Sequence, residues 1–363
     1  MGTVAKVELY DLFEDYKVVG GLRYAFNNNN REFFFSLENR LGRLDKKYSL
    51  QRQGIISAGN TSVYKVVIHQ LKYDLNYAFN EVIGLRSTLS LRNDRNIVLS
   101  TDRRALQAPD TYINWMGAKF ELVFDNVIDR GLNLYNGSRW KIFYERYQQI
   151  DDFQTDINIV GVDFRHYQKI HRDLIWAFRF AGSTSFGNRK LVYYLGAVDN
   201  WFTLSQDPDN PKFNPDTRIA QDQNYYFQAI ATNMRGFQQN IRNGNSFALV
   251  NNEIRWPIFK YFANKPIKSE FWGNFQIVGF TDVGTAWTGQ NPFSDENTFN
   301  TVEIIDGPVT VRLDNKKNPI VGSYGVGLRS KLWGYFGRLD YGYGIEDGKV
   351  LDPRVHLSFG LDF

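Results

Sequence analysis

The last nine residues, "VHLSFGLDF" (355–363), alternate strictly between apolar and other side chains. Such a period of two is typical of a strand with one apolar face, and it predicts a strand over 354–363. The apolar positions face one way: Val355, Leu357, Phe359, Leu361 and Phe363. The other positions face the opposite way: His356, Ser358, Gly360 and Asp362.

The same period recurs along the chain and gives about fifteen strand candidates. "YFGRLDYGY" (335–343), "KFELVFD" (119–125) and "FFFSLENR" (33–40) each set apolar side chains against charged ones. A soluble β-sandwich alternates too, but here the polar face is charged on nearly every strand and the apolar face is rich in aromatics. A membrane barrel explains both, with lipid outside and a watery lumen inside. We therefore predict an all-β transmembrane antiparallel β-barrel, with a soluble sandwich or propeller as the alternative.

Composition narrows the function classes. Of the 363 residues, 16% are aromatic, which suits strands and membrane interfaces. There is no cysteine, and the four histidines lack ligand spacing, so we expect no metal and no cofactor. The net charge of +4 is small and both signs interleave, which argues against a nucleic-acid partner. No apolar run approaches the roughly 18 residues of a transmembrane helix, and no signal peptide is visible.

Connection lengths are strongly asymmetric. The turns at 80–82 and 168–173 are short, whereas 185–245 and 288–319 are long. This asymmetry is typical of barrels with short periplasmic turns and longer outer loops. We predict one domain over 1–363, with the 185–245 stretch on the outer side. The mixed-charge stretch 92–104 is predicted to form an outer rim that meets lipopolysaccharide phosphates.

Four segments, in this order and spacing, resemble the outer-membrane assembly and secretion superfamily of BamA-like bacterial surface antigens. "MRGF" (234–237) resembles the Val-Arg-Gly-Phe of the family's sixth outer loop, with methionine in place of valine. "LVNNEIRWPI" (249–258), "GFTDVGTAW" (279–287) and the C-terminal strand follow it. The likeness is best over 115–363, and it extends to the C-terminal barrels of longer Bacteroidetes outer-membrane proteins. The residues that carry it are Met234, Arg235, Gly236, Phe237, Glu253, Asp282, Gly284, Trp287, Ser358, Gly360, Leu361 and Phe363.

The resemblance implies about sixteen strands and a 185–245 loop folded into the lumen. There Arg235 would pair with Asp282 and with Glu253, because a guanidinium binds a carboxylate through two parallel hydrogen bonds. Gly236 would allow a close backbone approach, and Phe237 would pack on the wall. The alternative is that Arg235 is solvated at a loop tip.

The last strand carries a second hypothesis. Gly360 lets the strand bend, and Phe363 would end the chain at the membrane interface. If the first and last strands pair weakly, the seam opens and offers unpaired backbone groups to an incoming strand. The alternative is that these residues serve only the insertion of this barrel itself.

The resemblance implies a bacterial outer-membrane barrel that inserts or translocates proteins, or lipid. Its implied partners are outer-membrane lipid and lipopolysaccharide, nascent or exported proteins, and a periplasmic module. A passive anchor for such a module and a solute channel are the alternatives. We do not expect an enzyme, because His356 and Ser358 lie two residues apart, about 7 Å along one strand, and no nucleophile motif is present.

Overall fold

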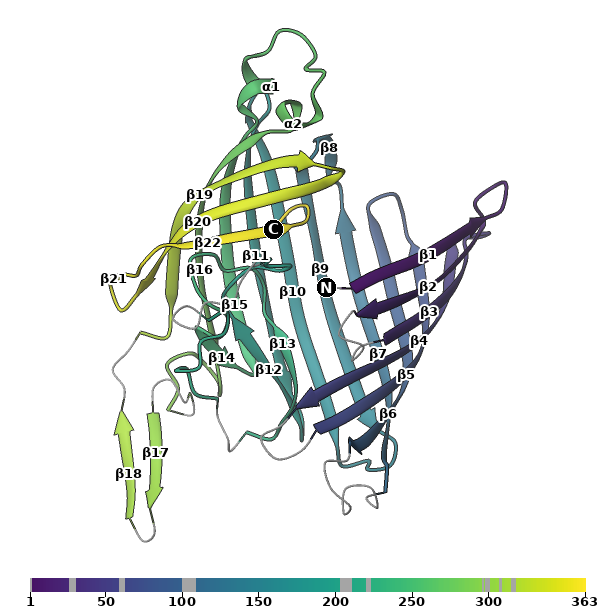
Figure 1. Ribbon diagram of the computed structural model, residues 1–363, viewed down its shortest axis with the longest axis vertical. Helices are drawn as coiled ribbons and strands as arrows, with labels where there is room; N and C mark the ends of the chain where they lie inside the picture. The colour runs from purple at the N-terminus through teal and green to yellow at the C-terminus, as the bar shows by residue number, and fades with distance from the viewer. Residues whose placement is uncertain are drawn as a thin grey trace. The chain divides into compact units, whose positions relative to one another are not determined.

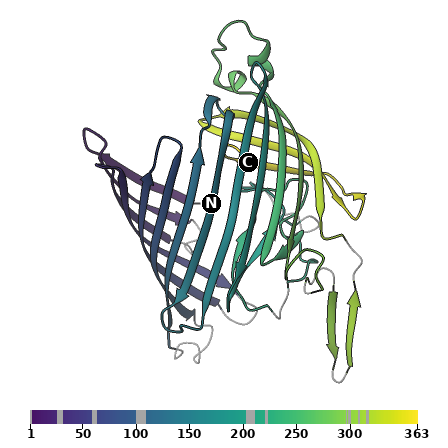
Figure 2. The same ribbon diagram turned by 180° about the vertical axis from the view of Figure 1, so that it is seen from behind.

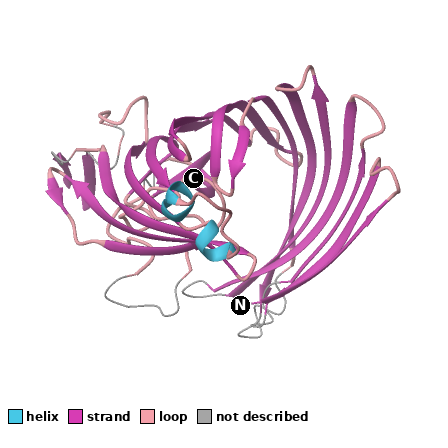
Figure 3. Ribbon diagram, turned by 90° about the horizontal axis from the view of Figure 1, so that it is seen from above, coloured by secondary structure: helices cyan, strands magenta, loops and turns pink. Residues whose placement is uncertain are grey.

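The computed structural model describes residues 2–25, 31–58, 63–99, 109–202, 211–219, 223–295, 297, 301–306, 309–314 and 318–363. Its regular structure is almost entirely strand, with two short helices (Figure 3). Neither of those helices has the length and apolar character that a membrane span requires. The all-β prediction is confirmed.

The described residues form twenty-two strands, numbered in chain order. The first eleven are β1 (Gly2–Tyr10), β2 (Tyr16–Ala25), β3 (Arg31–Asn39), β4 (Leu44–Ala58), β5 (Val63–Ala78), β6 (Ile83–Leu99), β7 (Thr111–Asp125), β8 (Ile128–Gly131), β9 (Leu134–Gln149), β10 (Asp156–His171) and β11 (Leu174–Phe186). The others are β12 (Lys190–Leu195), β13 (Tyr225–Ile230), β14 (Arg242–Gly244), β15 (Ser246–Trp256), β16 (Gln276–Trp287), β17 (Thr301–Asp306), β18 (Val309–Asp314), β19 (Val321–Leu332), β20 (Tyr335–Glu346), β21 (Lys349–Val350) and β22 (Arg354–Phe359). The helices α1 (Ile258–Phe262) and α2 (Glu270–Gly273) join β15 to β16.

Seventeen of these strands belong to one large sheet. Its registered pairs are antiparallel, as predicted. Closure of the sheet into a barrel stays a prediction. The chain divides into two compact units: unit 1 comprises 1–123 and 143–158, and unit 2 comprises 124–142 and 159–363.

Unit 1 begins as a meander in which each strand pairs with the next. β1 pairs with β2, and the pattern continues through β3, β4, β5 and β6. Figures 1 and 2 show these strands side by side, coloured purple to blue. The short connections between them suffice because antiparallel neighbours need only a tight turn.

Unit 2 holds the segments that resembled the assembly and secretion superfamily. Its strands pair in the order β11, β15, β16, β19, β20 and β22. The connection from β11 to β15 contains a small sheet of its own, formed by β12, β13 and β14. The predicted loop over 185–245 is therefore partly strand; its residues 203–210 and 220–222 lie outside the described part.

On β19 and β20 of unit 2, apolar side chains lie on the exposed face of the sheet and charged ones on the buried face. On β19, Tyr324 and Val326 are 43% and 57% exposed, whereas Arg329 is buried. On β20, Leu339 and Tyr341 are exposed, whereas Asp340 is fully buried. This arrangement is the reverse of a soluble protein's, and it matches a wall with lipid on its outer face.

Two sequence predictions need correction or comment. The last strand ends at Phe359 instead of running through 354–363, because Gly360 takes φ +152° and Asp362 φ +64°, outside the extended region. For the predicted rim at 92–104, β6 extends to Leu99, and residues 100–104 lie outside the described part.

We predict that Val326→Arg, on the exposed face of β19, destabilises the protein in lipid vesicles by about 2–4 kcal/mol, the cost of arginine on a lipid-facing barrel surface near the bilayer midplane. Val326→Leu is the matched control and should change little. The measurement is the free energy of unfolding from urea titrations in vesicles. Equal stability of the two variants would mean that this face does not meet hydrocarbon.

Candidate functional site

The Met234–Phe237 segment lies in the connection between β13 and β14, and its side chains are buried. Backbone hydrogen bonds hold this connection to the end of β12 and the residues after it: Met234 N–H donates to Ala197 O at 2.8 Å, and Ile241 N–H donates to Leu195 O at 2.9 Å. Arg235 is 1% exposed. The segment is therefore an ordered part of the unit 2 interior and not a solvated tip.

Arg235 binds two carboxylates on adjacent strands. Its Nε donates to Asp282 Oδ2 at 2.8 Å and its Nη2 to Asp282 Oδ1 at 2.6 Å, a two-pronged contact with β16. Its Nη1 donates to Glu253 on β15. The Arg235 backbone N–H also donates to Asp282 Oδ2, at 3.1 Å. We call these three side chains the loop anchor.

Phe280 completes the surroundings of the guanidinium. The Arg235 Cζ lies 3.9 Å from the centroid of the Phe280 ring, a cation–π distance. Phe280 is 4% exposed and lies two residues before Asp282 on the same strand face. The Phe-x-Asp pattern of β16 thus supplies both a ring and a carboxylate to one arginine, because residues two apart on a strand point the same way.

Glycines let the loop backbone approach β20 closely. Gly236 has φ +81°, and a Cβ added there would lie 3.0 Å from the Tyr343 carbonyl carbon. A Cβ at Gly342 would lie 3.2 Å from Gly236 N, and one at Gly344 would lie 2.5 Å from the Phe237 ring. No side chain fits at these three positions without displacement, so their glycines make room for the loop.

His356 of β22 adds a polar contact from another strand. The Gly236 N–H donates to His356 Nε2 at 3.1 Å. The His356 ring also packs edge-on against Trp201, with centroids 4.6 Å apart. His356 thereby holds the loop backbone in place.

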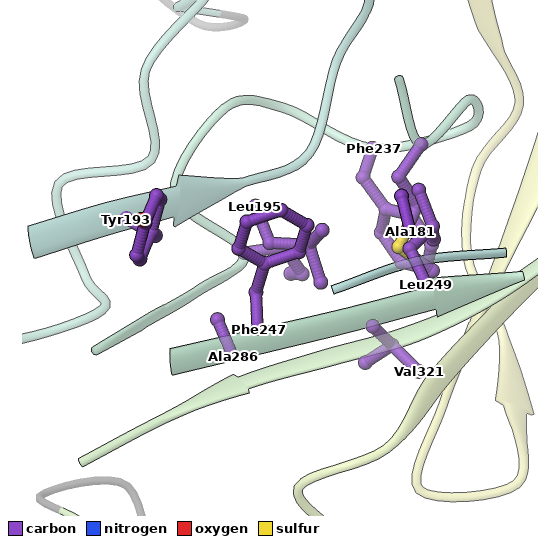
Figure 4. Packing of buried hydrophobic residues seen from close by; sticks show 10 residues of the cluster. Ala181, Tyr193, Leu195, Phe237, Phe247, Leu249, Ala286 and Val321 are labelled. Carbon is purple, nitrogen blue, oxygen red and sulfur yellow. The ribbon is translucent and has the colours of Figure 1, made fainter. Parts of the chain in front are cut away.

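An apolar cluster surrounds the other two motif side chains. Phe237 and Met234 belong to a buried cluster with Leu249 of β15 and Val321 of β19 (Figure 4). Gly284 leaves space for it, because a Cβ at this position would lie 2.6 Å from Leu249 Cδ1 and 3.4 Å from Met234 Sδ. Trp287 is the last residue of β16 and lies beside Gly244. A Cβ added at Gly244 would lie 2.0 Å from the Trp287 carbonyl carbon. The glycine and tryptophan of the β16 motif thus both border the loop.

The loop anchor continues into a larger network of buried ions. Arg255 Nε donates to Glu253 Oε2 at 2.7 Å, and Arg255 Nη2 donates to Asp362 Oδ1 at 3.0 Å. Arg329 of β19 lies 3.8 Å from Glu253 and pairs with Asp340 at 2.6 Å. Alternating signs allow these charges to be buried together, since each is paired. We call the following set the ion network: Asp282, Arg235, Glu253, Arg255, Arg329, Asp340, Asp362, Arg165, Asp163 and Arg179.

The C-terminal tail enters this network, which corrects the prediction for Phe363. Asp362 accepts from Arg165 Nη1 at 2.7 Å and from the Tyr167 hydroxyl. Phe363 is 8% exposed, and Arg255 lies 4.9 Å from its ring centroid, so it does not extend the apolar outer face. Only Leu361, 49% exposed, keeps an outward position. The tail turns because Gly360 allows it and because Asp362 finds three cationic or hydroxyl donors inside.

Arg235 and Asp362, two members of this network, stay ionised. Burial alone lowers the pKa of the Arg235 guanidinium, but Asp282 and Glu253 more than offset this and raise it above its ordinary value. Burial alone raises the pKa of the Asp362 carboxyl, but Arg255 and Arg165 more than offset this and lower it. The paired charges are therefore the stable form.

Ser358 shares a strand face with His356, and two other histidines contact hydroxyl groups. Ser358 is buried on the same face of β22 as His356. Elsewhere, His166 Nδ1 is 2.8 Å from the Ser138 hydroxyl, and His171 Nδ1 is 2.8 Å from the Tyr261 hydroxyl. Across the described residues, no three His, Asp or Glu side chains gather in a way that would hold a metal ion.

Several contacts of the loop were missed from the sequence. The period of two predicts that three of these residues lie on the inner side of the sheet, but it does not predict what they contact. They are Gly342, Gly344 and His356. Arg255, Asp340 and Asp362 were likewise visible only as polar positions. Two of these contacts, from Gly236 to His356 and from Arg255 to Asp362, join residues more than 100 positions apart, and alternation alone does not pair such residues.

The large antiparallel sheet of this chain is similar in fold to solved structures of BamA and CdiB. BamA from Haemophilus ducreyi lacking POTRA domains 1–3 matches with a TM-score of 0.58 and 13% identity, over 99% of this chain and 68% of that one.

Two CdiB structures match as well. CdiB from Acinetobacter baumannii has a TM-score of 0.52 and 13% identity, over 99% of this chain and 56% of that one. CdiB from Escherichia coli has a TM-score of 0.51 and 11% identity, over 98% and 58%. The sequence matches no protein-family model and no curated protein. At these identities the likeness establishes the fold.

We predict that Arg235→Ala or Asp282→Ala alone destabilises unit 2 by about 3–5 kcal/mol, because each leaves a buried charge unpaired. The double variant should cost clearly less than the sum of the two. Urea titrations of the four proteins measure the coupling. Arg40→Ala removes an exposed pair with Glu38 and serves as the control that changes little. Additive effects at Arg235 and Asp282 would contradict the anchor.

We also predict that Gly344→Val displaces Phe237 from its cluster, since even a Cβ falls 2.5 Å from the ring. Protease sensitivity of the 231–241 segment should then rise, while the sheet stays folded by circular dichroism. Gly348→Val, at a turn where a Cβ meets nothing within 4 Å, is the control, although its φ of +74° adds local strain. Unchanged protection of the segment in Gly344→Val would contradict the contact.

Proposed function

We propose that this chain is the barrel of a bacterial outer-membrane protein that inserts or translocates proteins. The observation that carries the proposal is the loop anchor, in which Arg235 is buried against both Asp282 and Glu253. The reversed distribution of apolar and charged side chains supports the membrane location. The fold shared with BamA and CdiB supports the comparison with assembly and secretion barrels.

The anchor fits such a role through positioning. A buried ion pair returns little net stability after desolvation, but it fixes the geometry of the groups it joins. Here it holds the Met234–Phe237 segment on the inner face of unit 2. A loop held at that place narrows any path along the inner face, which suits a regulated passage better than an open pore.

The edge of the last strand opposite β20 accepts hydrogen bonds from another part of the chain. β22 pairs with β20 along one edge. On its other side, Phe202 N–H donates to Leu357 O at 2.7 Å, and the Asn200 side-chain amide donates to Phe359 O at 3.2 Å. These carbonyl groups therefore accept hydrogen bonds from a segment outside the large sheet. Backbone pairing of this kind is how strand addition binds an extended peptide.

The test uses the full-length gene product in proteoliposomes. An unfolded small outer-membrane barrel protein is added, and its conversion to the folded, heat-modifiable form is followed over time. We predict severalfold faster folding with the wild-type protein than with empty liposomes, and loss of this gain in Arg235→Ala. Arg235→Lys keeps the positive charge but not the planar guanidinium that binds a carboxylate through two hydrogen bonds. Its folding rate should fall between those of the wild type and Arg235→Ala.

Conductance across planar bilayers is recorded in parallel. Low conductance that rises in Arg235→Ala supports a loop that restricts passage. High conductance of the wild type, with no effect on client folding or export, would overturn the proposal in favour of a solute channel. If the wild type neither speeds client folding nor conducts ions, the proposal is also overturned, and a passive membrane anchor is the remaining function.

A further inference from the structure

Unit 1 carries a groove on its apolar outer face. The groove has a volume of about 710 Å³, within the roughly 300–1,000 Å³ of small-molecule sites. It lies across β5, β6, β7 and β9 and is well separated in sequence from the loop anchor. Its side chains are mostly apolar: Leu71, Tyr73, Leu89, Leu91, Met116, Ala118 and Phe153, together with Gly117 and with Ser90, Arg146 and Gln148 as the polar members.

The groove exists because a small side chain, Ala118, forms its floor. Two contacts show how β7 and β9 pair: Ile150 N–H donates to Asn114 O at 2.8 Å, and a Cβ at Gly117 would lie 2.7 Å from the Tyr147 ring. Counting along this antiparallel pair places Ala118 opposite Arg146. On the same face of β7, Met116 is 45% exposed, so the alanine leaves a gap beside a large side chain.

Arg146 is an unusual residue for this face. Its Nη2 donates to the neutral Gln148 Oε1 at 3.3 Å, and no described carboxylate lies within ion-pair distance of its guanidinium. A cation on a lipid-facing surface is costly unless it reaches polar groups or an anion. An anionic partner would therefore stabilise the Arg146 guanidinium, and the described part of the chain does not supply one.

The outer face turns polar a few residues beyond Arg146. Asn93 Nδ2 donates to Asn114 Oδ1 at 2.7 Å, and the Asn114 side chain donates to Asp151 Oδ2 at 3.0 Å. Arg95 is already paired with Asp110, at 2.5 Å. The groove thus begins near a polar border and continues into an apolar wall, with the unpaired cation between the two.

We propose that this groove binds a lipid of the surrounding bilayer that carries a net negative, phosphate-bearing headgroup. An acyl chain lies over Ala118 between Leu91 and Met116, and the phosphate accepts hydrogen bonds from the Arg146 guanidinium. Arginine suits this contact because its fork donates two parallel bonds to a phosphate. The inference rests on the membrane location in the proposed function.

The experiment is native mass spectrometry of the detergent-purified protein after addition of phosphatidylglycerol or phosphatidylcholine of matched chain length. We expect the wild type to retain phosphatidylglycerol severalfold more than phosphatidylcholine. Arg146→Gln should abolish that preference, and Arg146→Lys should keep most of it. Ala118→Phe fills the groove and should lower retention of both lipids, with Ala118→Leu as the milder variant should the larger one misfold.

Arg95→Gln is the matched control, because this arginine lies in the same unit but already has a carboxylate partner. It should leave the lipid preference unchanged. Equal retention of the two lipids by the wild type, or an unchanged preference in Arg146→Gln, would overturn the inference. None of these variants touches the loop anchor, so client folding in proteoliposomes should be normal. A failed lipid test with normal client folding would overturn this inference alone. A positive lipid test without client folding would overturn the proposed function alone.

Discussion

The structure of unit 2 depends on one buried guanidinium. Arg235 occupies the space between Asp282 and Glu253 and lies over the Phe280 ring, and it is almost fully shielded from solvent. An arrangement of this kind is demanding, because every buried charge needs a partner at hydrogen-bonding distance. Its value lies in specifying one position for the loop, since the net stability from a buried pair is small.

From this arginine, pairing extends through the ion network to the end of the chain. Glu253 contacts Arg235 and also Arg255, and Arg255 reaches Asp362 in the C-terminal tail. The loop and the tail therefore bind to a shared set of charges on the inner face of unit 2. Arg255 contacts both Glu253 of the loop anchor and Asp362 of the tail, so one side chain joins the two.

The outer face has the composition expected of a surface in contact with hydrocarbon, where apolar side chains are favoured and unpaired polar groups are costly. Tyrosines, leucines and valines cover it in both units. Against that background, Arg146 beside Ala118 is an exception in both charge and size, and the two exceptions occur at one place. This coincidence is what gives unit 1 a binding site of its own, distinct in chemistry from the ion network.

The sequence by itself predicted most strands of the large sheet and the side of the sheet on which their side chains lie. A period of two is local, so alternation in 335–343 identified the inward arginine and aspartate of β20 without knowledge of their partners. The family resemblance predicts that the Arg-Gly-Phe segment meets the Phe-x-Asp strand, and in the folded chain Arg235 binds Asp282.

Only the tertiary structure decided what those inward positions touch. Gly342 and Gly344 looked like ordinary strand residues until the loop backbone was found against them. Phe363 continued the apolar alternation in sequence, yet it turned inward, because Gly360 permits the bend and Asp362 meets Arg165, Tyr167 and Arg255. Alternation fixes the side of a sheet on which a residue lies, whereas contacts across one or two hundred residues depend on how the chain packs.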